Sequence, residues 1–199
     1  MHSSGVTKIK RILNAVWIIS VSFFFIGCGG QKVSVRTDAQ RGTVEKVAVF
    51  PLENFTRDDY AAEKVRTIIN NELLLRGIEP VETGEVTRAL RESEVRSLGT
   101  LTTGQIQQTG KALRAQAVMT GSVGAYGISR GVTASYPEVS VQLTLHDVAG
   151  GQILWSAWHT AGGPNFWTRH FGTDGETLSE TASKAVKEIL DTFKSRVEK

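Results

Sequence analysis

Apolar and polar residues alternate from Glu138 to His146 in the stretch that ends at Asp147 (EVSVQLTLHD). Valine or leucine occupies every second position, and serine, glutamine, threonine and histidine lie between them, so one face of a strand should be buried and the other polar. The turn VAGG and a second apolar stretch, residues 152–160 (QILWSAWHT), follow directly. Together the two stretches predict an antiparallel hairpin with a single buried face.

The register of this hairpin depends on its turn. A type I turn with Gly150 in the left-handed region places Ile153 and Trp155 on the buried face. A slip of one residue would bury Trp158 in their place, because neighbouring side chains in a strand point to opposite faces. We choose the first register, since it buries Ile153 and Trp155 and leaves Ser156 exposed.

The remaining pattern predicts further helices and strands. Apolar residues recur at helical spacing in residues 58–76, 83–95, 104–114 and from about 174 onward. Shorter apolar or β-branched runs predict strands at residues 44–52, 78–81 and 116–126, and residues 128–136 are expected to form a loop or a ragged hairpin tip. The order β-α-β-α-α-β-β-β-α predicts a single compact α/β domain. Its mixed sheet of about five strands should have helices packed on it, with crossover connections first and antiparallel strands after them.

Several helix ends carry recognisable signals. Thr102 with Gln105, and Thr177 with Glu180, have the spacing of a capping box, in which the two residues bond each other's backbone N–H groups. Gly77 stands where a glycine in the left-handed conformation commonly ends a helix.

The start of the chain has a different pattern. Basic residues at positions 8, 10 and 11 precede an apolar run, residues 12–26, that is shorter than the roughly 20 residues of a membrane-spanning helix. The sequence FIGC that ends at Cys28 resembles the processing site of bacterial lipoproteins. The resemblance implies cleavage before Cys28 and acyl chains on its thiol and new amino group. A signal-anchor helix or an incidental buried cysteine is the alternative.

The predicted cleavage divides the chain into three parts. Residues 1–27 form a lipoprotein signal peptide, residues 28–43 a lipidated flexible tether, and residues 44–199 the α/β domain. The tether could reach about 50 Å if fully extended. Gly29 follows the lipidated cysteine where an aspartate would retain a lipoprotein in the inner membrane. The resemblance therefore implies a lipid anchor in the outer membrane, with the domain facing the periplasm.

Cleavage also removes the net charge. The whole chain has 23 Lys and Arg against 20 Asp and Glu, and residues 1–27 hold three of the basic residues and none of the acidic ones. The mature part is therefore balanced, which does not favour nucleic-acid binding. Its one cysteine excludes an intrachain disulfide and a cysteine-based zinc site.

Three stretches resemble a group of bacterial outer-membrane lipoproteins: VAVFPLENFT (residues 47–56), AVMTGSV (residues 117–123) and VSVQLTLHDVAGGQILWSA (residues 139–157). The group includes the curli-secretion lipoprotein (CsgG-like), the activators of penicillin-binding proteins (LpoB-like) and the Pel-polysaccharide export lipoprotein (PelC-like). The resemblance implies a domain like anticodon-binding domains. It also implies a non-enzymatic accessory or assembly factor of an envelope export, secretion or biogenesis machine, acting by protein contact or as a homo-oligomer.

The chain departs from the curli channel in one respect. Only a short insertion, residues 127–137, stands where that channel has long hairpins that build a membrane barrel, so a complete pore of that type is not expected. Asn54 and Phe55 resemble the Asn-Phe pair at the constriction of the channel and are candidate contact residues for a partner.

Residues 161–172 form a second candidate contact segment, for a partner or for the membrane. This stretch is rich in glycine, and tryptophan and arginine are favoured both at membrane interfaces and in protein contacts. Its candidate residues are Phe166, Trp167, Arg169 and Phe171. The alternative is that the segment folds back and buries its aromatic side chains against the last helix.

The sequence contains little that favours an enzyme. It has no Gly-x-Ser-x-Gly elbow, and its closely spaced glycines at 121, 124 and 127 do not lead into a helix as a phosphate-binding loop would. We expect no catalysis, no metal, and no cofactor other than the lipid on Cys28. The alternative is an envelope enzyme or small-ligand-binding protein that uses a sheet face carrying His146 and His159.

Overall fold

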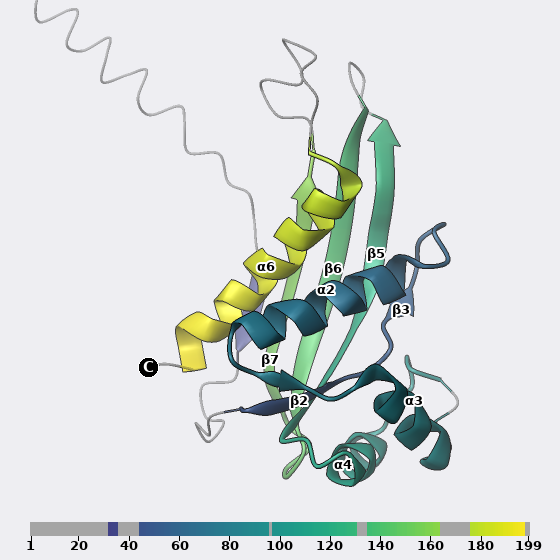
Figure 1. Ribbon diagram of the computed structural model, residues 1–199, viewed down its shortest axis with the longest axis vertical. Helices are drawn as coiled ribbons and strands as arrows, with labels where there is room; N and C mark the ends of the chain where they lie inside the picture. Colours follow the sequence, from purple (N-terminus) through teal and green to yellow (C-terminus); the bar gives the residue numbers. More distant parts are fainter. Residues whose placement is uncertain (1–31, 36–43, 96, 131–134, 164–175, 198–199) are drawn as a thin grey trace, which may run out of the picture. The chain divides into compact units, whose positions relative to one another are not determined.

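The computed structural model of the protein describes residues 32–35, 44–95, 97–130, 135–163 and 176–197 (Figure 1). The strands are β1 (Lys32–Val35), β2 (Lys46–Val49), β3 (Glu53–Asn54), β4 (Glu79–Pro80), β5 (Ala117–Arg130), β6 (Ser135–Asp147) and β7 (Ile153–Gly162). The helices are α2 (Ala61–Leu75), α3 (Thr83–Glu92), α4 (Thr103–Ala112) and α6 (Leu178–Val197).

The strands form one mixed sheet in the order β1-β7-β6-β5-β2-β4, with β3 paired to β5 off this path. Strand β2 is parallel to β4 and β5, and β3 is parallel to β5. Strands β5, β6, β7 and β1 are joined by antiparallel pairing. The predicted fold class is therefore confirmed, with crossover connections in the first half of the sheet and hairpins in the second.

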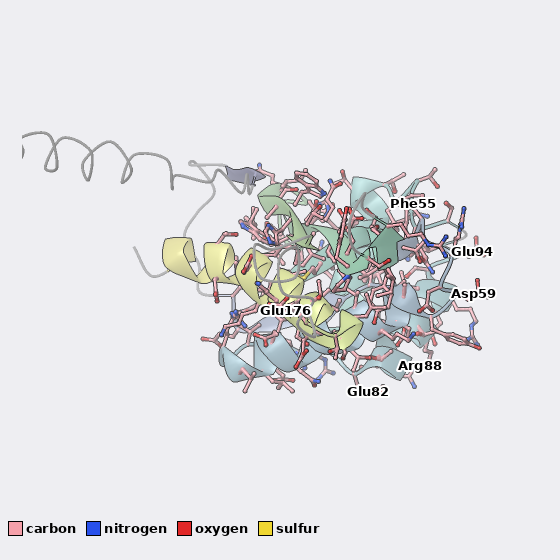
Figure 2. The ribbon with its side chains drawn as sticks, turned by 90° about the horizontal axis from the view of Figure 1, so that it is seen from above. Phe55, Asp59, Glu82, Arg88, Glu94 and Glu176 are labelled. Carbon is pink, nitrogen blue, oxygen red and sulfur yellow. The ribbon has the colours of Figure 1, made fainter. Side chains whose placement is uncertain are left out.

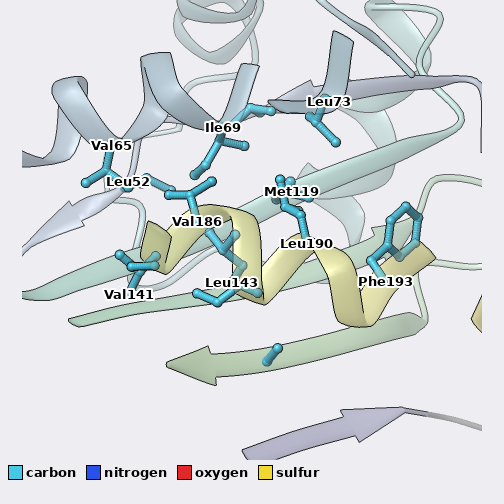
Figure 3. Close-up of a cluster of buried hydrophobic side chains, with 14 of the residues drawn as sticks. Leu52, Val65, Ile69, Leu73, Met119, Val141, Leu143, Val186, Leu190 and Phe193 are labelled. Carbon is cyan, nitrogen blue, oxygen red and sulfur yellow. The ribbon is translucent and has the colours of Figure 1, made fainter. Parts of the chain in front are cut away.

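Helices α2 and α6 cover one face of the sheet (Figure 1). Their apolar stripes meet the inward residues of β2, β5, β6 and β7 in a single buried cluster, part of which Figure 3 shows. Trp155 of β7 is 1% exposed and lies with its ring centroid 5.8 Å from that of Phe193 on α6. Its indole Nε1 donates to Thr192 Oγ1 at 3.2 Å, so the largest buried side chain is also hydrogen-bonded.

A charged side chain is buried within this layer. Arg66 of α2 is 2% exposed, and its Nε and Nη2 donate to the carbonyl oxygen of Val49 at 3.1 and 2.8 Å. Burial lowers the pKa of the guanidinium, and the nearby carboxylate of Glu63 opposes that shift. The arginine satisfies a backbone acceptor at the end of β2 that would otherwise be buried without a partner.

Helices α3 and α4 pack against a smaller area of the opposite face. Their buried residues, Val86 and Ile106 among them, form a second buried cluster with Ala48 of β2, Phe50 just after it and Val118 of β5. Helix α4 comes close to the sheet at Gly110, where a Cβ atom would collide with the Val148 side chain and lie 3.1 Å from Val118 Cγ2. The glycine therefore makes room for the helix.

The predicted helix signals are confirmed. Thr102 Oγ1 accepts from the backbone N–H of Gln105, and the Gln105 side chain accepts from the backbone N–H of Thr102. Thr177 and Glu180 bond each other in the same reciprocal way, and α6 begins just after them, at Leu178. Gly77 follows α2 with φ of 76°.

The hairpin between β6 and β7 corrects part of the prediction. Leu145 pairs with Trp155 but His146 pairs with Ile153, so Leu154 is an extra residue in β7. Trp155 is buried as predicted, whereas Ile153 is 48% exposed because the bulge reverses its direction. The glycine with a left-handed backbone is Gly151, with φ of 67°, and the assignment to Gly150 was wrong.

Two further segments differ from the prediction. Residues 128–136 are not simply a loop, since β5 continues to Arg130 and β6 begins at Ser135. The Ser129 hydroxyl donates to the Glu138 carboxylate across this extended pair. Within the segment predicted to be a tether, residues 32–35 form β1, which pairs with the free edge of β7.

The two candidate histidines do not share a face, which corrects the alternative site. His159 pairs with Val141 on the face covered by α6, and its Nε2 lies 2.6 Å from Glu188 Oε2. His146 pairs with Val118 on the opposite face, with its Nε2 3.1 Å from Thr120 Oγ1. Burial lowers the pKa of His146. Because the sheet separates them, the two imidazoles do not form one site.

The packing of α4 leads to a prediction with a matched control in the same helix. Gly110→Ala should lower the free energy of unfolding by about 1–3 kcal/mol, because the new methyl group overpacks the contact with Val148. Gly104→Ala, where no atom lies within 4 Å of the new methyl group, should be neutral or stabilising by up to about 1 kcal/mol. Chemical denaturation of the two variants measures the difference, and equal stability would contradict the close approach of α4.

Candidate interaction surface

Most of the residues predicted to make contacts lie outside the described part of the chain. These are the lipidation residue Cys28 and the aromatic segment residues Phe166, Trp167, Arg169 and Phe171. Their roles remain predictions. The described candidates are Asn54 and Phe55, which lie at the carboxyl end of the short strand β3.

Asn54 fixes the turn that follows β3. Its Oδ1 accepts from the backbone N–H and the hydroxyl of Thr56 at 3.0 and 2.8 Å, and its Nδ2 donates to the backbone carbonyl of Asp58 at 2.8 Å. Such local bonds are the usual reason for asparagine in a turn. The half-buried amide is therefore occupied within the turn and shapes the loop from inside.

Phe55 is the residue that this turn presents. Its backbone N–H donates to the carbonyl of Val123 at 3.0 Å, which holds the loop against β5, while its side chain is 67% exposed (Figure 2). A large aromatic ring that is held at the surface by a bonded backbone loses little conformational entropy when a partner covers it. Phe55 thus has the properties of a contact residue.

The start of α2 gives this loop a fixed charged neighbour. Lys64 Nζ lies 2.7 Å from Asp58 Oδ2, and this bond lowers the pKa of Asp58 and raises that of Lys64. The same ammonium stands 5.4 Å from the centre of the Tyr126 ring, within the range of a cation–π contact. Lys64 at the start of α2 thereby links Asp58 of the loop that carries Phe55 to Tyr126 of β5.

The second exposed surface is the part of the sheet that α3 and α4 leave uncovered, on the side opposite α2 and α6. We call it the open face and define it by outward side chains of β5, β6 and β7: Thr120, Ser122, Ser140, Gln142, Thr144, Ser156, Trp158 and Thr160. The alternating pattern predicted the polar residues of β6 correctly. It did not single out Trp158, because its role depends on contacts with the neighbouring strand.

Two further observations limit the chemistry of the described residues. Within them, no group of three or more His, Cys, Asp and Glu side chains is arranged to hold a metal ion. Of the helices described, none combines the length and the apolar character needed to cross a bilayer. What these residues offer is an exposed aromatic loop and a polar sheet face, both suited to binding.

Solved structures resemble this fold. The PelC dodecamer from Paraburkholderia phytofirmans is 23% identical, with a TM-score of 0.55 over 81% of this chain and 96% of that chain. A single-substitution variant of that dodecamer is 25% identical, with a TM-score of 0.56 over the same shares. Lipoprotein GNA1162 from Neisseria meningitidis is 16% identical, with a TM-score of 0.54 over 75% of this chain and 98% of that chain.

The family comparison is more direct. No curated protein matches the sequence. The model of one protein family, described as peptidoglycan-synthase activator LpoB, matches residues 31–160. These residues run from just before β1 almost to the end of β7 and so include residues of every strand described. The chain therefore belongs to the LpoB family of peptidoglycan-synthase activators.

Proposed function

We propose that this protein is an outer-membrane lipoprotein that activates a peptidoglycan synthase by protein–protein contact and has no catalytic activity of its own. The observation that carries the proposal is the family match over residues 31–160. A role as a non-catalytic accessory lipoprotein agrees with a surface that offers contact residues, and the family description names the machine that such an accessory would serve.

Phe55 is the proposed contact residue for the synthase. Residues that dominate protein interfaces are commonly aromatic or arginine side chains near the centre of the contact. The Phe55 ring is 67% exposed, on a loop that its own backbone bond and the Asn54 amide hold in place. The synthase would therefore meet a preformed surface.

Lipid on Cys28 is the proposed means of attachment. The sequence before it has the order of a lipoprotein signal peptide, and Gly29 after it implies delivery to the outer membrane. Several acyl chains on one residue hold a protein firmly, since each buried methylene contributes about 0.8 kcal/mol. The domain would then work in the periplasm, on the inner side of that membrane.

A second candidate function is a ring in a polysaccharide-export machine. It is favoured by the likeness to the PelC dodecamer, which reaches 25% identity over 81% of this chain. In this case the active form would be a closed homo-oligomer. The activator proposal requires no such ring, so the mass of the purified protein separates the two.

The contact prediction concerns Phe55. Phe55→Ala should weaken binding to a peptidoglycan synthase from the same bacterium, and the stimulation of its glycan synthesis, by about tenfold or more. Leu75→Ala removes a side chain that is 80% exposed at the other end of α2 and should change neither. Because both residues are exposed, thermal unfolding should stay the same. Equal stimulation by wild type and Phe55→Ala would rule out this contact.

The anchor prediction concerns Cys28. In the producing bacterium, Cys28→Ser should abolish incorporation of radiolabelled palmitate and move the protein from the outer-membrane fraction to the soluble periplasmic fraction or leave it as an unprocessed precursor. A Ser3→Ala variant, changed before the basic residues of the leader, should fractionate like wild type. If Cys28→Ser incorporates label or fractionates unchanged, the lipid anchor is excluded.

The oligomer prediction concerns the whole chain in detergent. Light scattering that subtracts the detergent should give a monomer or small oligomer if the protein acts as a synthase activator. A mass near that of twelve chains would favour the export ring and count against the activator proposal.

A further inference from the structure

We propose that the open face of the sheet binds an uncharged glycan strand built from N-acetylated amino sugars, with Trp158 as the platform on which a sugar ring stacks. The site consists of Trp158 and Thr160 on β7, Ser140 and Gln142 on β6, and Ser122 on β5. It does not include the residues of the Phe55 loop.

The position of Trp158 is set by a bond across the sheet. Its indole Nε1 donates to the Ser140 hydroxyl at 3.1 Å, although the residue directly opposite Trp158 is Gln142. The indole therefore extends diagonally from β7 toward β6. Trp158 is nevertheless 41% exposed, whereas Trp155 on the covered face is 1% exposed. Part of a hydrogen-bonded indole is thus left accessible to a ligand.

Hydroxyl groups surround this ring and are already ordered. Ser140 Oγ also receives a bond from Thr160 Oγ1 at 3.0 Å, and Thr144 Oγ1 and Ser156 Oγ are bonded to each other at 3.0 Å. Gln142 is exposed opposite Trp158. A hydroxyl both donates and accepts, and an amide carries two donors and an acceptor, so the face can pair with sugar hydroxyl and acetamido groups.

The charge of the open face selects the kind of ligand. The eight side chains that define it carry no formal charge. Charged residues border it: Lys32 of β1 stands opposite Trp158, and Glu138 precedes Ser140 by two positions on β6. Phosphate groups and anionic lipids are recognised by arginine and lysine, which these eight positions lack. An apolar helix would need an apolar groove. A neutral polymer with hydroxyl groups at its edges and C–H groups on its ring faces matches this surface.

The choice of an N-acetylated glycan rests on the proposed function in one respect, since a peptidoglycan-synthase activator works beside such strands. The width of the site is consistent with a short part of a chain. Strands β5 and β7 are separated by β6, so their backbones lie about 10 Å apart. The glycan would cross the strands with one ring over Trp158 and its neighbour over the hydroxyl groups of β5 and β6.

The test is a calorimetric titration of the full-length protein in detergent with chitohexaose. Wild type should bind, and Trp158→Ala should weaken binding by about tenfold or more, as expected when one aromatic stacking contact is lost. Trp158→Phe keeps a ring and should retain part of the affinity. Tyr60→Ala removes an aromatic side chain that is 72% exposed before α2, away from the open face, and should bind like wild type. Thermal unfolding of each variant verifies that the fold is kept.

Three results would overturn the proposal. The first is absence of binding by wild type at millimolar chitohexaose, and the second is equal binding by wild type and Trp158→Ala. The third is binding to isolated peptidoglycan that is lost when its peptide stems are removed, because the stems would then be the ligand. Stimulation of the synthase separates this test from the proposed function: Trp158→Ala should still stimulate, and Phe55→Ala should lose stimulation while keeping its affinity for chitohexaose.

Discussion

The packing of α2 and α6 on one face of the sheet is the constraint on which the other features depend. Neighbouring side chains of a strand point to opposite faces, so burying Leu143, Leu145 and Trp155 beneath these helices directs the residues between them outward. The buried guanidinium of Arg66 supports the same layer by bonding the end of β2. The polar open face is therefore a consequence of a well-filled core on the other side.

Much of the fold could be predicted because its signals are local. The alternation in β6, the capping box at Thr102 and the glycine at 77 each act within a few residues. The failures occurred at the hairpin, where one extra residue changes the face of its neighbour. Leu154 forms a bulge in β7 and Ile153 turns outward, and the left-handed glycine is Gly151 instead of Gly150. Neither β1 nor the full length of β5 could be read locally, because both depend on a partner strand.

On the candidate surface, too, local features could be predicted from the sequence, whereas features that depend on neighbouring strands could not. The sequence indicated that Phe55 and Asn54 belong together, but their different roles depend on the turn, in which the amide is bonded inward and the ring is left outward. The prediction that His146 and His159 share a sheet face was wrong, because their positions along the paired strands direct them to opposite faces. Trp158 could be assigned to the outward face, yet its bond to Ser140 requires knowledge of which strand lies beside it.

Strand β1 has a consequence for where the domain can act. Only three residues stand between Cys28, the proposed lipidation residue, and Lys32, so β1 begins no more than about 14 Å along the chain from that cysteine. If Cys28 carries lipid as proposed, pairing of β1 with β7 would keep the connection between the anchor and the sheet short. Unpairing these four residues would lengthen the connection between Cys28 and the sheet, since the next strand begins at Lys46. A single edge strand would thus govern how deep into the periplasm the protein reaches.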